Sequence, residues 1–185
     1  RSSDIYELDN TVSGKQAAPR PLRLYMPKVP LFNLRDTNLS PDFVTSMDTF
    51  NKMYKTAGGY TKVDGIIAVD TKALVAAMNI LGDMQVDGVT YSTKNDPRCD
   101  CPQVIYALEE YADQPLQIVK QNRKAIIGDL MYAIMNKAFS SSPKLYWGPL
   151  FQTMLDQTSQ KHIIFYSFNK DAQSGLEALN ASGRM

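Results

Sequence analysis

The stretch VDGIIAVDTKALVAAMNILGDMQVDGVTYS, residues 63–92, restricts the possible folds more than any other part of the chain. Residues 63–70 are a short run rich in Val and Ile between turn residues, which predicts a strand buried on both faces. A helix then begins at Asp70 or Thr71 and ends at Gly82, with an apolar stripe of Leu74, Val75, Met78 and Leu81. Residues 84–92 predict another strand or a hairpin. A strand, a helix and a strand in this order indicate a layered α/β fold.

The other predicted elements lie on both sides of this stretch. Residues 1–30 are punctuated by prolines, which cannot donate to a β-ladder, so we expect an extended arm or edge segment there. A helix is predicted from Ser40 as N-cap and Pro41 as first residue to the pair Gly58 and Gly59. Later segments predict helices at 102–111, 115–139, 145–157 (with a break or late start at Gly148 and Pro149) and 171–179, and a strand at 162–168.

Composition limits the class of protein. A charged fraction of 21% and a hydrophobic fraction of 44% over 185 residues are those of a globular protein, and we expect a single domain over residues 1–185. The formal net charge of +1 does not provide the dense basic surface that nucleic-acid binding needs, so no nucleic-acid partner is expected. No apolar run approaches the ~18 residues of a membrane span. Because the chain begins with Arg1, we expect that an N-terminal segment and an upstream membrane anchor precede it.

Several kinds of site have little support in the sequence. His162 is the single histidine, and at the start of an apolar strand it is more typical of a structural edge residue than of a triad base. Cys99 and Cys101 are too few for a zinc site, which leaves two free thiols or a small local disulfide. Nucleotide-binding loops and HExxH zinc motifs are not found.

Phosphate chemistry is the alternative that the sequence supports. LRDTNLSPDF places an arginine, a carboxylate and a helix N-terminus within one segment, and these can bind phosphate, hold Mg²⁺ and donate N–H groups respectively. The candidates are Arg35 for phosphate and Asp36 for metal, although such a segment can also simply close a loop. In KQNRK, Lys120 lies three residues before Arg123 and four before Lys124, on nearly one helical face. This segment is either a second phosphate contact or a solvated basic face.

The chain resembles an uncharacterised family of bacterial cell-envelope domains. The resemblance covers LRDTNLSPDF, the glycine pair 58–59, VDGIIAVD with its helix, NRK at 122–124 and YSFNKDAQSGLEAL at 166–179. The family has an opening segment with a GGF-type motif that is not found in this chain. The resemblance implies an extracytoplasmic protein that is anchored to the membrane.

Residues 33–137 are also distantly similar to the LytR-CpsA-Psr enzymes, whose fold is a three-layer α/β/α sandwich with a mixed central sheet. These enzymes transfer glycopolymers from polyprenyl-pyrophosphate carriers to peptidoglycan with Mg²⁺. The resemblance implies catalytic roles for Arg35, Asp36 and Arg123, phosphate contacts from Arg35, Lys120, Arg123 and Lys124, and Mg²⁺ at Asp36. Several positions depart from the enzymes' pattern. Leu34 replaces a proline, Lys120 replaces an arginine, so a planar fork becomes a point charge, and Lys124 replaces a glutamine. No lysine stands at the expected place before the glycine pair 58–59.

Two functions follow as hypotheses. In the first, an envelope domain binds a phosphorylated, polyprenyl-pyrophosphate-linked glycan and, as a Mg²⁺-dependent phosphotransferase, transfers the glycopolymer to the cell wall, with peptidoglycan as a further partner. In the alternative, the same fold is a non-catalytic binding or scaffolding module of the cell envelope. The first predicts that Arg35, Asp36 and Arg123 line one cleft, whereas the second places basic groups in ordinary surface ion pairs.

Overall fold

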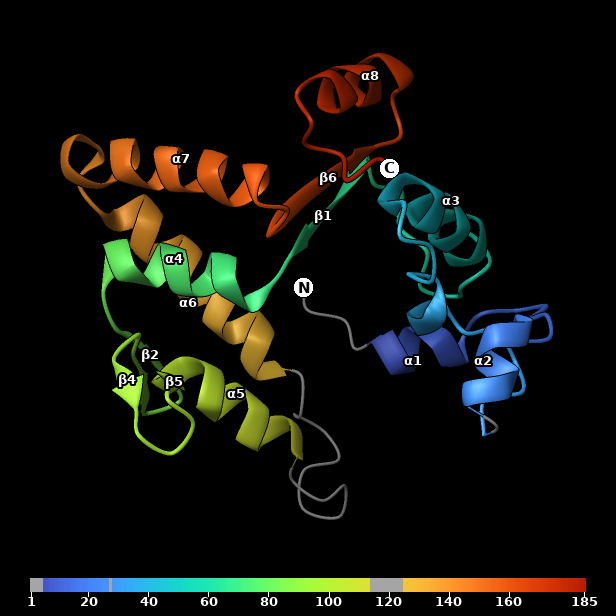
Figure 1. Cartoon of the computed structure of the whole chain (residues 1–185), viewed down its shortest axis with the longest axis horizontal. Helices are drawn as coiled ribbons and strands as arrows, with labels where there is room; N and C mark the ends of the chain where they lie inside the picture. Colours follow the sequence, from blue (N-terminus) through green and yellow to red (C-terminus); the bar gives the residue numbers. More distant parts are fainter. Residues whose placement is uncertain (1–4, 27, 114–124) are drawn as a thin grey trace. The chain divides into compact units, whose positions relative to one another are not determined.

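The computed structural model describes residues 5–26, 28–113 and 125–185 (Figure 1). Within these ranges the chain divides into two compact units. Unit 1 contains residues 5–67 and 164–185, and unit 2 contains residues 68–163. Unit 2 is therefore an insertion between two separate parts of the sequence of unit 1.

The secondary structure is a mixture of α-helices and short strands, which confirms the α/β class. Unit 1 contains helices α1 (Ile5–Asn10), α2 (Arg20–Tyr25), α3 (Phe43–Tyr54) and α8 (Lys170–Ala178), and the 3₁₀ turn η1 (Leu34–Asp36). Unit 2 contains helices α4 (Thr71–Leu81), α5 (Gln103–Asp113), α6 (Ala125–Ser140) and α7 (Pro143–Ser159), and strands β2 (Met84–Val86), β3 (Val89–Tyr91), β4 (Asn95–Asp96) and β5 (Cys101–Pro102). In the described part of the chain, no helix is long and apolar enough to span a bilayer.

The chain passes between the units within strands β1 (Gly65–Val69) and β6 (Ile163–Ser167), which form a two-stranded sheet (Figure 1). The amide of Phe168 donates to the carbonyl of Asp64, and the amide of Asp70 donates to the carbonyl of His162, so the strands run antiparallel. The prediction that the first strand is buried on both faces is wrong, because Ile67 is 62% exposed and Val69 is 43% exposed. A run of Val and Ile does not imply burial when a strand has a single neighbour.

The described strands form three separate two-stranded sheets, β1 with β6, β2 with β3 and β4 with β5. The structure therefore supports the α/β class without supporting a continuous central sheet among these residues. Most of the buried hydrophobic residues in the described part of the chain lie in helices.

The N-terminal segment is not extended throughout. Helices α1 and α2 lie within it, and isolated bridges pair Val12 with Ala57 and Ala17 with Leu31. Proline is compatible with α2 because Pro21 occupies the first turn, where a helix has no use for the missing N–H. The described prolines therefore lie at the ends of short elements and do not form one long extended arm.

Helix α3 begins later than the sequence predicts. Its N-cap is Asp42, whose carboxylate accepts a hydrogen bond from the amide of Thr45 at 2.8 Å, and Ser40 lies before the cap. The C-terminal segment packs beside this start, since the amide of Phe43 donates to the carbonyl of Gly183. Gly183 has φ +62°, and a Cβ there would lie 2.9 Å from Cγ2 of Ile164. Glycine is thus required where the chain end meets α3.

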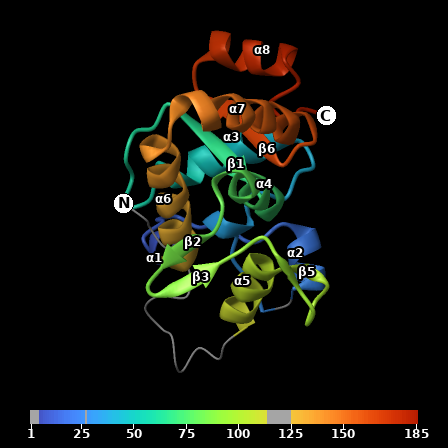
Figure 2. The ribbon, with the colours of Figure 1, turned by 90° about the vertical axis from the view of Figure 1, so that its left-hand side faces the viewer.

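The core of unit 2 confirms the predicted helix and hairpin between residues 70 and 92. Asp70 caps α4 by accepting hydrogen bonds from the amides of Lys72 and Ala73, and the helix ends at Gly82. The β2–β3 hairpin turns at Asp87 and Gly88, both with positive φ, as a two-residue turn between twisted strands requires. Figure 2 shows this hairpin beside α5. The buried residues of this core are Leu74, Met78, Leu81, Met84, Val86, Tyr91, Val104, Ile126, Leu130 and Ile134.

Helix α7 is longer and more continuous than the sequence predicts. It runs through Gly148 and Pro149 without a break and packs on α4. The last predicted strand and helix are confirmed as β6 and α8. The predicted helix at 115–139 is confirmed from Ala125 onward, and its first part lies outside the described residues.

Candidate functional site

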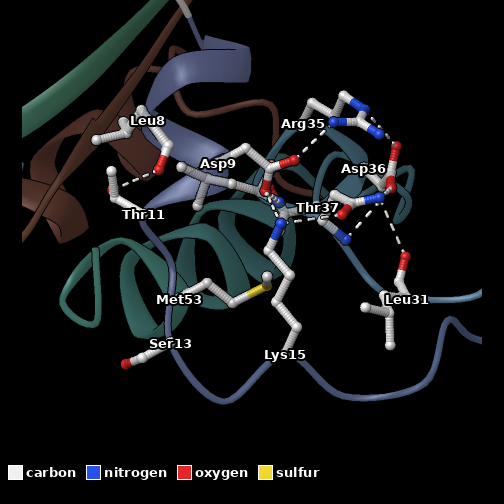
Figure 3. Close-up of polar contacts among 12 residues, drawn as sticks. Leu8, Asp9, Thr11, Ser13, Lys15, Leu31, Arg35, Asp36, Thr37 and Met53 are labelled. Carbon is white, nitrogen blue, oxygen red and sulfur yellow. Dashed lines mark hydrogen bonds and ion pairs between the residues drawn. The ribbon is translucent and has the colours of Figure 1, made fainter. Parts of the chain in front are cut away.

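The first candidate site surrounds Asp9, a residue that the sequence analysis did not single out (Figure 3). Asp9 lies in α1 and is completely buried. Its Oδ2 accepts from Nη1 of Arg35 at 2.6 Å, and its Oδ1 lies 3.1 Å from Nζ of Lys15. The amide of Leu34 also donates to Oδ1, at 2.7 Å. A buried carboxylate is stable when charge partners and hydrogen bonds satisfy it, and here both are present.

Arg35 therefore has a structural partner within its own unit. Its guanidinium contacts the carboxylate of Asp9 and lies 4.9 Å from the ring centre of Tyr6. The side chain is 33% exposed, so one part of it faces solvent while another reaches the buried acid. A phosphate at this position would compete with Asp9 for the same cation.

Asp36 stabilises the turn that places Arg35. Its Oδ2 accepts hydrogen bonds from the amide of Asn33 at 3.3 Å and from Nδ2 of Asn33 at 2.9 Å, which closes a capping box around η1. Its Oδ1 lies 4.0 Å from Nε of Arg35. We call Asp9, Lys15, Arg35 and Asp36 the acidic-centre cluster. Its two carboxylates and two cations cancel, so it offers no net positive charge to an anion.

This geometry does not fit the implied Mg²⁺ site. One oxygen of Asp36 accepts hydrogen bonds from Asn33 and the other faces the Arg35 cation, so neither is free of a competing partner for Mg²⁺. In the described ranges, no group of three or more His, Cys, Asp or Glu residues could hold a metal ion.

The second predicted segment cannot be compared with the first. Lys120, Arg123 and Lys124 lie outside the described residues. Whether Arg123 shares a cleft with Arg35 and Asp36 therefore stays a prediction.

A different part of unit 1 gathers positive charge. A cavity of about 710 Å³ lies against α3, β6, α8 and the segment that follows α3. Four cations line it: Lys55, Lys62, Lys170 and Arg184. Asp48 is the single carboxylate among the described lining residues, so the cavity has an excess of three positive charges. We call it the cationic cavity.

Asp48 is bound within the wall of the cavity. The hydroxyl of Tyr166 in β6 donates a hydrogen bond to the carboxylate of Asp48 in α3. Burial of Tyr166, followed by its hydrogen bond to Asp48 and the charge of that carboxylate, raises the pKa of Tyr166 to about 12. The phenol thus keeps its proton and binds one oxygen of the Asp48 carboxylate.

The four cations differ in their surroundings. Nε of Arg184 lies 3.7 Å from Oδ2 of Asp42, the α3 cap. Hydrogen bonds to Asp42, chiefly from the amide of Thr45, lower the pKa of this carboxyl despite the opposing effect of burial, so Asp42 stays charged beside Arg184. Among the described residues, no carboxylate forms an ion pair with Lys55, Lys62 or Lys170. These three lysines are exposed.

Aromatic and aliphatic side chains complete the cavity. Tyr60 is 41% exposed and packs edge-to-face on Tyr54, with ring centres 5.2 Å apart. Phe168 packs in the same way on Tyr166, at 5.1 Å. Val44 and Val63 add apolar surface. Cations beside aromatic faces suit a ligand that combines an anionic group with a sugar ring or a hydrocarbon segment.

Sequence reasoning missed this cavity because its cations come from three distant parts of the chain. Lys55 and Lys62 follow α3, Lys170 begins α8, and Arg184 is next to the last residue. Local motifs cannot reveal such an arrangement.

In unit 2, His162 takes part in a smaller arrangement. Its Nδ1 lies 2.6 Å from Oδ2 of Asp70, and the backbone of the two residues is also hydrogen-bonded. Burial raises the pKa of Asp70, but hydrogen bonds from His162 and from the amides of Ala73 and Lys72 outweigh this and lower it. The contact joins the end of β1 to the start of β6, in keeping with a structural edge residue.

Comparisons with known proteins identify one related family. A family described as "Protein of unknown function (DUF4012)" has a model that matches residues 1–97, just over half of the 185 residues. Searches of curated proteins and of solved structures gave no match.

Proposed function

Because the chain belongs to the DUF4012 family, described as proteins of unknown function, we propose a role from the site itself. We propose that it is an extracytoplasmic cell-envelope domain that binds a phosphorylated, polyprenyl-pyrophosphate-linked glycan, with the phosphates in the cationic cavity. The observation that supports this most directly is the excess of three positive charges in one cavity. The intact protein is anchored to the membrane in this proposal, which places the domain where lipid-linked glycans are found.

The size and lining of the cavity support an anionic head group as ligand. Its volume of about 710 Å³ falls within the range typical of small-molecule sites, roughly 300–1,000 Å³. This accommodates a pyrophosphate with an adjoining sugar or the first isoprene units, and leaves the rest of the lipid outside. Three lysines can rearrange around phosphate oxygens, and Tyr60 offers a ring face for the adjoining group.

Binding without transfer is better supported than catalysis. Transfer by the implied mechanism needs Arg35 on the phosphates and Mg²⁺ on Asp36, but Arg35 contacts buried Asp9 and Asp36 caps η1. We therefore favour the non-catalytic module. The three-layer sandwich and the distant likeness to the LytR-CpsA-Psr enzymes stay predictions, and the binding proposal does not depend on them.

Calorimetric titration with soluble probes tests the proposal. Farnesyl pyrophosphate represents the lipid side, glucose 1-phosphate the sugar side, and inorganic pyrophosphate the anion alone. We expect farnesyl pyrophosphate to bind more tightly than inorganic pyrophosphate, because the aromatic walls add apolar contact. Equal affinity for these two would identify a general anion site instead.

A pair of matched variants locates the site. Lys55→Ala/Lys170→Ala removes two cations from the cavity, and Lys94→Ala/Lys144→Ala removes two exposed cations from unit 2. We expect the first to weaken farnesyl pyrophosphate binding at least about tenfold, or about 1.4 kcal/mol, and the second to leave it unchanged. Equal affinities of the two variants would exclude the cavity. Binding that required Mg²⁺ and disappeared in chelator would instead favour the transferase hypothesis.

A further inference from the structure

Unit 2 contains a disulfide that contributes little as a cross-link. Cys99 and Cys101 are joined across a single intervening residue. A disulfide stabilises a fold mainly by restricting the unfolded chain, and this effect grows with the length of the loop that it closes. Because this loop contains a single intervening residue, the disulfide restricts the unfolded chain very little and adds little to the free energy of unfolding. Stabilisation of the fold therefore does not explain the bond.

Other contacts already hold the turn that carries the two sulfurs. The carboxylate of Asp96 accepts hydrogen bonds from the amide of Arg98 at 3.0 Å, from its Nε at 2.9 Å and from its Nη2 at 2.7 Å. The Arg98 guanidinium also stacks over the ring of Tyr106, 3.8 Å from its centre. The carbonyl of Asp96 accepts from the amide of Asp100. Opening the disulfide therefore leaves the turn with its main supports.

The bond is also accessible and attached to strained backbone. Cys99 is exposed and Cys101 is half-buried. Asp100, between them, has φ +52°, a left-handed conformation that costs energy for a residue with a side chain. Exposed or strained disulfides exchange with thiols more readily than buried structural ones. Reduction would allow Asp100 to relax while Asp96 and Arg98 kept the cysteines close.

We propose that Cys99–Cys101 is an exchangeable disulfide that oxidises a dithiol in another polypeptide. A thiolate of that polypeptide attacks Sγ of Cys99, the sulfur on the exposed residue. The Cys99–Cys101 bond breaks, and Cys101 leaves as a thiolate that takes a proton from water. The second thiolate of the polypeptide then attacks its own sulfur in the mixed disulfide and releases Cys99. Two electrons pass to the domain, and the polypeptide gains one disulfide.

Reduction under native conditions is the first test and needs no variant. The oxidised chain is incubated with reduced glutathione in buffer and in urea, alkylated at intervals, and its thiols are counted by mass spectrometry. We expect the folded chain to be reduced within about tenfold of the rate in urea, with unchanged circular dichroism. Reduction that is at least about a hundredfold slower in buffer would overturn the proposal, because the bond would then open only on unfolding.

Transfer to a substrate is the second test. The oxidised chain is mixed without oxygen with an equimolar reduced peptide that contains two cysteines, and peptide disulfide is measured by chromatography. We expect peptide disulfide to form as the domain is reduced, and Cys99→Ser/Cys101→Ser to form none. In the presence of oxidised peptide, Cys101→Ser should accumulate more mixed disulfide than Cys99→Ser. Failure of the wild-type chain to oxidise the peptide overturns the activity, and the reverse order of trapping overturns the assignment of Cys99.

Discussion

The acidic-centre cluster and the cationic cavity both belong to unit 1, yet they use their arginines and lysines in opposite ways. In the cluster, the buried carboxylate of Asp9 organises Arg35 and Lys15, and the charges cancel. In the cavity, the hydroxyl of Tyr166 binds Asp48, the one carboxylate among the described lining residues, and three lysines have no carboxylate partner in the described part of the chain. Arg35 thus lies in a motif that predicts phosphate binding but stabilises the fold. The three lysines of the cationic cavity belong to no motif and have charge available for a ligand.

Removing Arg35 should produce the largest effect and should appear in stability rather than in binding. Arg35→Ala leaves Asp9 buried with Lys15 as its remaining cation, so we expect a loss of about 3 kcal/mol in the free energy of unfolding. Urea denaturation followed by circular dichroism measures it, and Lys62→Ala, which removes a cavity cation, is the control. If Arg35→Ala kept full stability but lost binding of farnesyl pyrophosphate, the roles of the two regions would be reversed.

The hydrogen bond in the cavity wall should give a pH dependence at alkaline pH. The pKa of Tyr166 is raised from 10.0 to about 12, so the protonated phenol favours the folded state. This contribution is fully present below pH 10 and is lost as pH rises towards 12, a decrease of about 2 to 3 kcal/mol. The difference in unfolding free energy between the wild type and Tyr166→Phe isolates it from other tyrosines. A difference that stayed constant up to pH 12 would contradict the raised pKa.

Added salt should affect the cationic cavity more than the acidic-centre cluster. Exposed cations are screened strongly by added salt, whereas a buried pair is screened much less. Raising the ionic strength should therefore weaken farnesyl pyrophosphate binding several-fold, equivalent to about 1 kcal/mol, and change the stability that depends on Asp9 and Arg35 very little. Titrations and urea denaturation at two salt concentrations provide both measurements. Binding that is insensitive to salt would show that the lysines do not contact the ligand.

Arg184 should give the smallest effect because it combines features of both regions. It lines the cavity and also lies 3.7 Å from Asp42 in an exposed ion pair. Such pairs contribute about 0 to 1 kcal/mol, so Arg184→Ala should change stability by no more than that and weaken binding by a few-fold. A stability loss as large as that of Arg35→Ala would place Arg184 with the structural cations.

The parts of the fold that the sequence predicts correctly depend on local chemistry. The Asp70 cap, the apolar stripe of α4, its end at Gly82 and the hairpin within residues 84–92 each depend on a few neighbouring residues, and each is confirmed. Partners that are distant in sequence determine the features that differ. The exposure of β1 depends on how many strands join it, and at the start of α3 the amide of Phe43 donates to the distant carbonyl of Gly183.

The same distinction explains the candidate sites. The motif LRDTNLSPDF does form a polar junction. The partner of Arg35, however, is Asp9, which lies 26 residues earlier in a segment without a recognisable motif. Burial of that one aspartate changes Arg35 from a free cation into a structural one. No local pattern predicts it, because burial is a property of the packed fold.

The insertion of unit 2 into unit 1 has a consequence for biosynthesis. As the chain emerges from the ribosome, residues 68–163 are available as one continuous stretch before residues 164–185 have been made. Unit 1 cannot close until residues 164–185 return to it, and Lys170 and Arg184 are among them. A product that stalls before residue 164 would therefore have only half of the described residues that line the cationic cavity.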